Sequence, residues 1–270
     1  MNNEFPLWQP WIFSGMPTAD AFTFVSLLYF PNYILNLFFL SSNMIQLLHL
    51  LFAGIGSYLL LRFIGLSCLS AFLGGSAFMI TPFMITMIVF GHGSQMMTAA
   101  YIPWIMMLTM KLFRNPNLLN IGILAILMGF QLQRAHVQIA YYSCMLIGAY
   151  FLYSFIRKKH NKNKYLLYFI ISCGLGFLLA SHIYYPSLDY LDSSIRSGGN
   201  NHYQYATNWS MHPKELLTYL FPYYYGFGGS SYSGYMPFTD YPNYMGIIIL
   251  IFAIIGGVKS DNREKNLFIF

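Results

Sequence analysis

Long apolar segments that lack charge in their middle constrain this chain more than any other feature. Seven such segments lie at 43–61, 66–90, 96–113, 118–132, 137–156, 165–185 and 244–258. A helix that crosses the hydrocarbon core of a bilayer needs roughly 20 mostly apolar residues. Only helices and closed barrels satisfy the backbone in lipid, and the alternating pattern of barrel strands is absent. We therefore predict an all-α fold, a polytopic transmembrane helical bundle.

The composition agrees with a membrane protein and excludes several soluble classes. Charged residues make up 8% and hydrophobic residues 57% of the chain, whereas about a quarter of a soluble domain is charged. The net charge of +6 is explained by the placement of Lys and Arg beside the apolar segments, so no nucleic-acid partner is expected. Cys68, Cys144 and Cys173 lie in apolar segments without CxxC spacing, and they are read as small buried residues.

The positive-inside rule sets the predicted orientation. Eleven of the 14 basic residues fall in alternate connections, which we assign to the cytoplasm. They are Arg62, Lys111, Arg114, Arg157, Lys158, Lys159, Lys162, Lys164, Lys259, Arg263 and Lys265. The opposite connections hold six of the 8 acidic residues and most of the histidines. The polar functional groups are therefore expected on the outer face of the membrane.

This orientation divides a single transmembrane domain, residues 1–270, into four parts. Residues 1–42 form a first extracytoplasmic loop, in which 22–40 is interrupted at Pro31 and is predicted to form two short interfacial helices. Residues 43–185 contain six spans, and 186–242 form a large extracytoplasmic loop rich in Tyr and Gly. Residues 243–270 hold a further span and the start of the next. An outer loop at the start without a preceding span or signal sequence, and an apolar segment that only begins at 266, predict a fragment truncated at both ends.

The loop at 186–242 holds most of the candidate binding groups. Its aromatic side chains suit the membrane interface, while Trp209 and its Tyr neighbours would equally stack on a sugar. Glu215 follows Pro213 at a helix start, where a carboxylate favours the helix dipole, and Asp240 precedes a Tyr-Pro turn. Each carboxylate is also a candidate general base or hydroxyl ligand.

Several other outer polar residues have two readings. Arg196 lies beside a Gly pair and would bind a phosphate in bidentate fashion, or it pairs with Asp192 on the surface. His92, His136 and Gln138 occupy outer turns, where they line a cavity mouth as hydrogen-bonding groups or simply cap helices. No HExxH or paired Cys/His spacing occurs, so no metal site is predicted from spacing.

Six segments of the chain, in register from one end to the other, resemble the YfhO-like family of bacterial membrane proteins. They are LWQPWIFSGMP (7–17), GH followed by AAYIPW (91–104), QLQRAHVQIAYY (131–142), SSIRSGG (193–199), ATNWSMHPKELLTYLFPYYYGFGG (206–229) and YPNYMGI (241–247). That family looks like part of the GT-C superfamily of glycosyltransferases. The resemblance implies a GT-C-like bundle that is multi-pass in the bacterial plasma membrane.

The same resemblance implies a reaction and its partners. A sugar would pass from a polyprenyl-phosphate-linked donor to an envelope polymer acceptor at the outer face, among membrane lipids. A divalent cation is a candidate cofactor, and no other is implied. The principal catalytic acid is expected upstream of Met1, so Asp20 is the only candidate catalytic carboxylate near the expected place. His92, His136 and Gln138 would line the cavity mouth, and Arg196 would meet the donor phosphate.

The sequence is also compatible with two other function classes. A transporter or channel usually carries ionisable groups or broken helices near the bilayer midplane. The segments here have no Asp, Glu, Lys or Arg in their middles, and Pro82 is the only central break. A non-catalytic factor for polymer export or assembly would instead use the loop at 186–242 as a protein-binding surface.

The orientation predicts a labelling pattern for single cysteines placed in a chain that has its native cysteines replaced. Cysteines within 186–242 should react with an impermeant maleimide on intact cells. Cysteines within 157–164 should react only after permeabilisation. The reverse pattern would overturn the orientation and every outer site assigned from it.

Overall fold

The computed structural model describes residues 8–11, 15–17, 28–134, 136–158, 160–191, 203, 207–208, 210–239 and 243–259. Five helices in this part of the chain are long and apolar enough to cross a membrane. They are Ser42–Phe63, Cys68–Val89, Gly93–Arg114, Val137–Arg157 and Lys162–Leu188. The prediction of a helical protein with several membrane-spanning helices is confirmed at this level.

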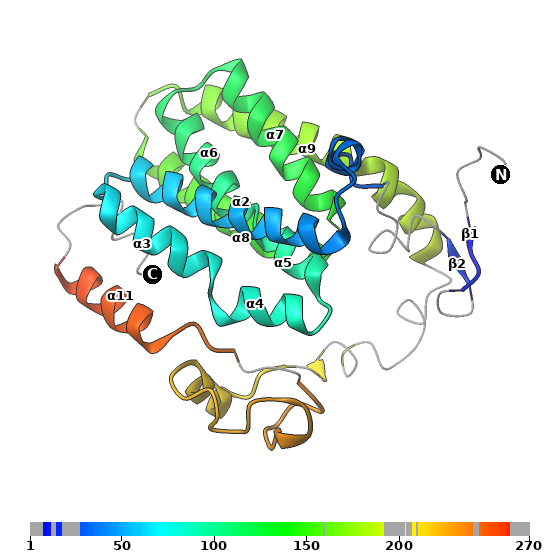
Figure 1. Ribbon diagram of the computed structural model, residues 1–270. Helices are drawn as coiled ribbons and strands as arrows, with labels where there is room; N and C mark the ends of the chain where they lie inside the picture. Colours follow the sequence, from blue (N-terminus) through cyan, green and yellow to red (C-terminus); the bar gives the residue numbers. More distant parts are fainter. Residues whose placement is uncertain are drawn as a thin grey trace.

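Two of the five spans are broken into shorter helices (Figure 1). After α2 (Ser42–Phe63), the second span consists of α3 (Cys68–Met79) and α4 (Pro82–Val89). The predicted bend at Pro82 is confirmed, because the proline has no amide hydrogen and begins α4 while Thr81 caps it. The third span divides into α5 (Gly93–Ala99) and α6 (Ile102–Arg114), a break that the apolar pattern did not predict.

The remaining helices follow the predicted segments closely. They are α7 (Leu118–Gln133), α8 (Val137–Arg157), α9 (Lys162–Leu191) and α11 (Ile247–Lys259). α9 includes Pro186 and continues to Leu191, so the helix extends past the predicted start of the outer loop. Neither α7 nor α11 reaches the length of the five spans.

The N-terminal stretch contains only small elements among its described residues. The strands β1 (Trp8–Gln9) and β2 (Met16–Pro17) pair antiparallel. The helices α1 (Pro31–Leu35) and η2 (Asn36–Phe38) precede α2. Two short helices were predicted over 22–40, and both observed helices begin at or after the proline; residues 22–27 lie outside the described part.

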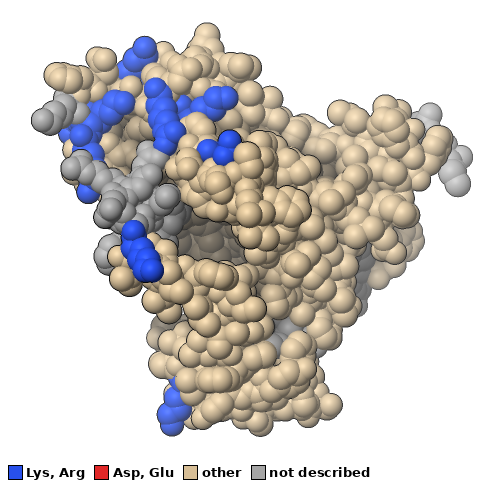
Figure 2. Space-filling view, turned by 60° about the vertical axis from the view of Figure 1, so that its left-hand side comes forward, with Lys and Arg blue, Asp and Glu red and all other residues tan. Residues whose placement is uncertain are grey.

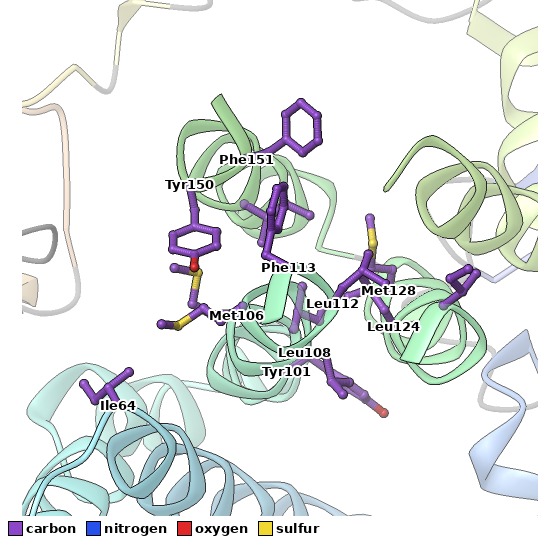
Figure 3. Packing of buried hydrophobic residues seen from close by; sticks show 14 of the residues in the cluster. Ile64, Tyr101, Met106, Leu108, Leu112, Phe113, Leu124, Met128, Tyr150 and Phe151 are labelled. Atoms are coloured by element: carbon purple, nitrogen blue, oxygen red, sulfur yellow. The ribbon is translucent and has the colours of Figure 1, made fainter. Parts of the chain in front are cut away.

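The main hydrophobic core surrounds α6, whose side chains are buried on several sides (Figure 3). Leu108, Leu112 and Phe113 of α6 pack against neighbours from α7 and α8. Phe113 meets the rings of Tyr150 and Phe151 edge to face, at centroid distances of 5.9 and 5.4 Å. α6 is therefore the central helix against which the other spans are placed.

The helices α7 and α9 form the most extensive helix pair in the described chain. Small residues allow this approach: Ala125 and Gly129 on α7 face Gly176 and Ala180 on α9. A Cβ atom at Gly176 would lie 3.1 Å from the Ala125 carbonyl oxygen and 3.0 Å from a Met128 carbon. Small residues at four-residue spacing are the usual means by which helices approach closely in lipid.

The described basic side chains among those assigned to the cytoplasm share one end of the helices; Lys159, Arg263 and Lys265 lie outside the described residues. Arg114 at the end of α6 donates to the Phe63 carbonyl at the end of α2, at 3.1 Å. Lys158 after α8 donates to the Phe113 carbonyl at 3.3 Å. Figure 2 shows most of the visible Lys and Arg side chains gathered at this end, with no acidic side chain among the described residues of that face. Cations at helix C-termini also stabilise the helix dipoles.

The α7–α9 contact predicts a large difference between two glycines of one helix. Gly176→Val should destabilise the protein by about 1–3 kcal/mol, because the added methyl groups overpack the contact. Gly174→Val is the matched control, since a Cβ there meets no atom within 4 Å. Thermal unfolding in detergent, followed by the accessibility of the partly buried Cys144 and Cys173, measures both; Cys68 is exposed, against the expectation from the sequence. Equal midpoints for the two variants would contradict the packing described.

Candidate functional site

A cluster of buried polar side chains lies at the end of the helices opposite the cations. It consists of Tyr29, His49, Tyr101 and Arg134, with 2%, 5%, 4% and 9% of their surfaces exposed. They come from four parts of the chain: the segment before α1, α2, the break between α5 and α6, and the end of α7. Buried polar groups are normally hydrogen-bonded. The atoms of the cluster that lack a partner within the protein are therefore the ones that could bind a ligand.

The three ring side chains form a directed chain of hydrogen bonds. His49 Nδ1 lies 2.8 Å from the Ile45 carbonyl oxygen, which only accepts, so this nitrogen carries the hydrogen. In the neutral ring Nε2 then accepts from the Tyr29 hydroxyl at 2.8 Å. The Tyr29 oxygen in turn accepts from the Tyr101 hydroxyl. The two hydroxyl hydrogens therefore point toward His49, and His49 itself donates to the Ile45 carbonyl.

The backbone around Tyr29 is held by the ends of α7 and α9. The Phe30 amide donates to Gln133 Oε1 at 3.0 Å. The His182 ring donates from Nε2 to the Leu28 carbonyl at 3.2 Å and stacks on the Phe30 ring with centroids 4.7 Å apart. Tyr29 therefore occupies a position determined by helices far from it in the sequence.

Arg134 is the charged member of the cluster. Its guanidinium carbon lies 4.6 Å from the centre of the Tyr29 ring, a cation–π contact. Its Nε atom is buried without a hydrogen-bond partner. Asp189 lies in α9, but its side chain is outside the described part; the one acidic side chain that the structure describes, Glu215, bonds instead to Tyr232. Burial lowers the pKa of Arg134, while the two tyrosines oppose that shift.

Burial also affects the tyrosine that faces the guanidinium. It raises the pKa of Tyr29 to about 12, against smaller lowering effects of the Tyr101 hydrogen bond and of Arg134. The hydroxyl therefore stays protonated near neutral pH and does not neutralise Arg134. The cluster consequently has a positive charge without an anionic partner among the described residues.

A cavity of about 250 Å³ reaches the cluster from the side. Its lining combines the three hydrogen-bonded rings with apolar residues of α1 and α2: Tyr29, Pro31, Ile34, Leu35, Leu48, His49, Phe52 and Tyr101. Ile34 and Leu48 are exposed on the outer surface of the helices. The cavity therefore joins an apolar surface to a polar end.

Two predicted site residues, His92 and His136, lie close to each other at this same end. Burial lowers the pKa of His136, and the neighbouring His92 lowers it further. The Nδ1 atom of His136 is buried without a hydrogen-bond partner. Gln138, two residues after His136, is exposed and donates to the Tyr142 hydroxyl at 2.8 Å.

The other predicted residues are distributed differently. Glu215 is buried in the loop between α9 and α11, in surroundings made by the loop itself. Asp20, Arg196, Trp209 and Asp240 lie outside the described residues. Among the residues that the structure describes, no three His, Cys, Asp or Glu side chains group as a metal site.

Sequence reasoning did not single out the buried cluster, although two signals pointed to it. Arg134 is one of only three basic residues that break the charge alternation on the outer side. His49 is an ionisable residue well inside an apolar segment, and such residues are often functional. Tyr29 and Tyr101 gave no such signal, because tyrosine is abundant throughout the chain.

No protein-family profile, curated protein or solved structure matches this chain. The resemblance to the YfhO-like family therefore stays a prediction.

The hydrogen-bond chain predicts that removing the single hydroxyl oxygen of Tyr29 lowers the free energy of unfolding. Tyr29→Phe should destabilise the protein by about 1–3 kcal/mol, because it leaves buried groups of His49 and Tyr101 without a partner. Tyr33→Phe, at a residue 56% exposed, is the matched control. The midpoint of thermal unfolding in detergent reports both changes, and equal midpoints would show that the Tyr29 hydroxyl is not part of a buried network.

Proposed function

We propose that this protein is a membrane glycosyltransferase that takes its sugar from a polyprenyl-phosphate donor at the outer face. The observation that carries the proposal is Arg134, buried beside a polar cluster without an anionic partner in the described chain. A buried charge is costly unless a counter-charge accompanies it. Arginine binds phosphate through paired hydrogen bonds, so a phosphate is the ligand that suits this residue best.

The cavity beside the cluster supports a lipid-linked phosphate over a soluble one. Its walls at Ile34, Leu35 and Leu48 are apolar and suit an isoprenoid chain. Its polar end carries the hydroxyls of Tyr29 and Tyr101, which suit the oxygens of a headgroup. An amphipathic ligand with an apolar tail and a polar head thus matches the lining of the cavity; Arg134 is not part of that lining but contacts the ring of Tyr29, which is.

Sugar transfer also needs a base and an acceptor site, which we assign from the sequence. Asp20 is proposed to take the proton of the acceptor hydroxyl. His92 and His136, near each other at this end, are proposed to border the acceptor, an envelope polymer. Trp209 and Asp240 keep their predicted roles toward the sugar. Arg134 takes the phosphate role first assigned to Arg196, which then serves as an additional contact.

The proposal is tested by transfer of a radiolabelled sugar from a polyprenyl-phosphate donor to envelope polymer, using the full-length gene and its deletion. Arg134→Gln should raise the KM for the donor about 10- to 100-fold, the equivalent of a lost charged hydrogen bond. It should not lower the unfolding midpoint, because the buried charge that it removes has no acidic partner among the described side chains and keeps only its cation–π contact with Tyr29. Asp20→Asn should abolish kcat and leave donor binding intact.

Lys111→Gln is the matched control, since it removes one positive charge from the opposite end of the helices. It should leave the KM unchanged. Unchanged incorporation in the gene deletion, across a panel of donor sugars, would reject the transferase. A transporter or a non-catalytic export factor would then be the better explanation.

A further inference from the structure

The loop between α9 and α11 has its own folded centre. Residues 210–239 contain the 3₁₀ helices η3 (Pro213–Tyr219) and η4 (Gly229–Ser231). Backbone hydrogen bonds close the loop on itself, from the Gly229 amide to the Thr239 carbonyl and from the Ser233 amide to the Tyr225 carbonyl, both at 2.8 Å. In Figure 1 this part, coloured yellow to orange, lies apart from the helices.

Glu215 of η3 is the buried acid at this centre, with 2% of its surface exposed. Its Oε1 atom accepts from the Tyr235 amide at 2.6 Å and from the Tyr232 hydroxyl. The Met236 amide donates to that hydroxyl oxygen at 2.8 Å, so the Tyr232 hydrogen is directed at the carboxylate. Burial, followed by this hydrogen bond, raises the pKa of Tyr232 to about 12, and the hydroxyl keeps its proton.

The second carboxylate oxygen of Glu215 is in a different situation. Oε2 is buried and has no hydrogen-bond partner. No ion pair joins Glu215 to a Lys, Arg or His among the residues that the structure describes. Leaving a buried carboxylate oxygen without any partner costs several kcal/mol, and none of the residues that the structure describes supplies one to this atom.

A small enclosed space adjoins the carboxylate. Glu215 lines a cavity of about 10 Å³, which is room for one particle the size of a water molecule. The other lining residues that carry side-chain oxygen are Thr218, Tyr232, Thr239 and Asn243. Thr218 donates its hydroxyl hydrogen to the Glu215 carbonyl at 2.6 Å, so its oxygen retains lone pairs.

We infer that this cavity is a binding site for a hard divalent cation, with Ca²⁺ as the expected ion and Glu215 as its charged ligand. Oxygen ligands from a carboxylate, hydroxyls and an amide are those that Ca²⁺ takes, in irregular geometry. Mg²⁺ demands near-octahedral geometry, which an uneven lining of this kind does not provide. A water molecule would occupy the space but would leave the carboxylate charge uncompensated.

The site is separate from the Arg134 cluster and does not rest on the proposed sugar transfer. With a single carboxylate, its dissociation constant should be on the order of 10⁻⁴–10⁻³ M, as in extracellular calcium modules. A bound ion would tie η3 to the residues around Tyr232 and Asn243. The loop would then be held in shape by the cation.

The test is titration of the purified full chain in detergent with Tb³⁺, a luminescent Ca²⁺ substitute that nearby tyrosines sensitise. Saturable emission on tyrosine excitation, displaced by Ca²⁺, is expected. Glu215→Gln keeps an oxygen for Tyr232 and Tyr235 but removes the charge, and it should weaken binding at least about tenfold. Asn243→Asp adds a second carboxylate and should strengthen it by a similar factor.

Glu4→Gln is the control, because it removes a carboxylate from another part of the chain and should leave the titration unchanged. Folding of each variant is checked by limited proteolysis of the loop, which Ca²⁺ should slow in the wild type. Emission that is absent in the wild type, or equal in Glu215→Gln, overturns the inference. If Glu215→Gln does not fold, an unchanged affinity in Asn243→Asp overturns it. Neither readout involves sugar transfer, so the two proposals fail separately.

Discussion

The close approach of α7 and α9 is the contact on which the candidate site depends. Lipid tails are as apolar as the helix surfaces, so packing of small residues, not burial from water, brings these helices together. Gly129 and Gly176 allow the approach. It places Gln133 at the end of α7 near Leu179 of α9, whose carbonyl accepts from the Gln133 amide at 3.0 Å. The backbone around Tyr29 is held by this same pair of helices.

The candidate site combines polar groups that are hydrogen-bonded to one another with a buried charge that is not. Tyr101, Tyr29 and His49 form a linear hydrogen-bond chain that ends at the Ile45 carbonyl, which stabilises these polar groups inside a helical bundle. Arg134 is added to that chain as a charge with an unpartnered Nε atom. A bundle selected for stability alone would place an apolar residue there, so the arginine indicates a ligand that brings the missing negative charge.

Charge divides the molecule into two functional ends. Arg114 and Lys158 lie exposed or partly exposed at helix C-termini and bind carbonyl oxygens of neighbouring helices, which suits residues that set orientation. Arg134 is buried at the other end, and Glu215 is buried in the outer loop. The exposed cations thus bond to carbonyl oxygens of neighbouring helices, whereas the two buried charged groups are the ones for which we propose ligands.

The sequence by itself determined the helical class, the five long apolar helices and the break at Pro82, because these follow from apolar length and from proline's missing amide hydrogen; two further predicted spans, 118–132 and 244–258, form shorter helices. It also indicated Glu215, His92 and His136 as candidate site residues, of which the two histidines lie near each other. Only the tertiary structure joined Tyr29, Tyr101 and His49 to Arg134, since these residues lie on four separate segments. Their hydrogen bonds depend on how the helices pack. The hydrophobic pattern within one segment does not show which other segments will pack against it.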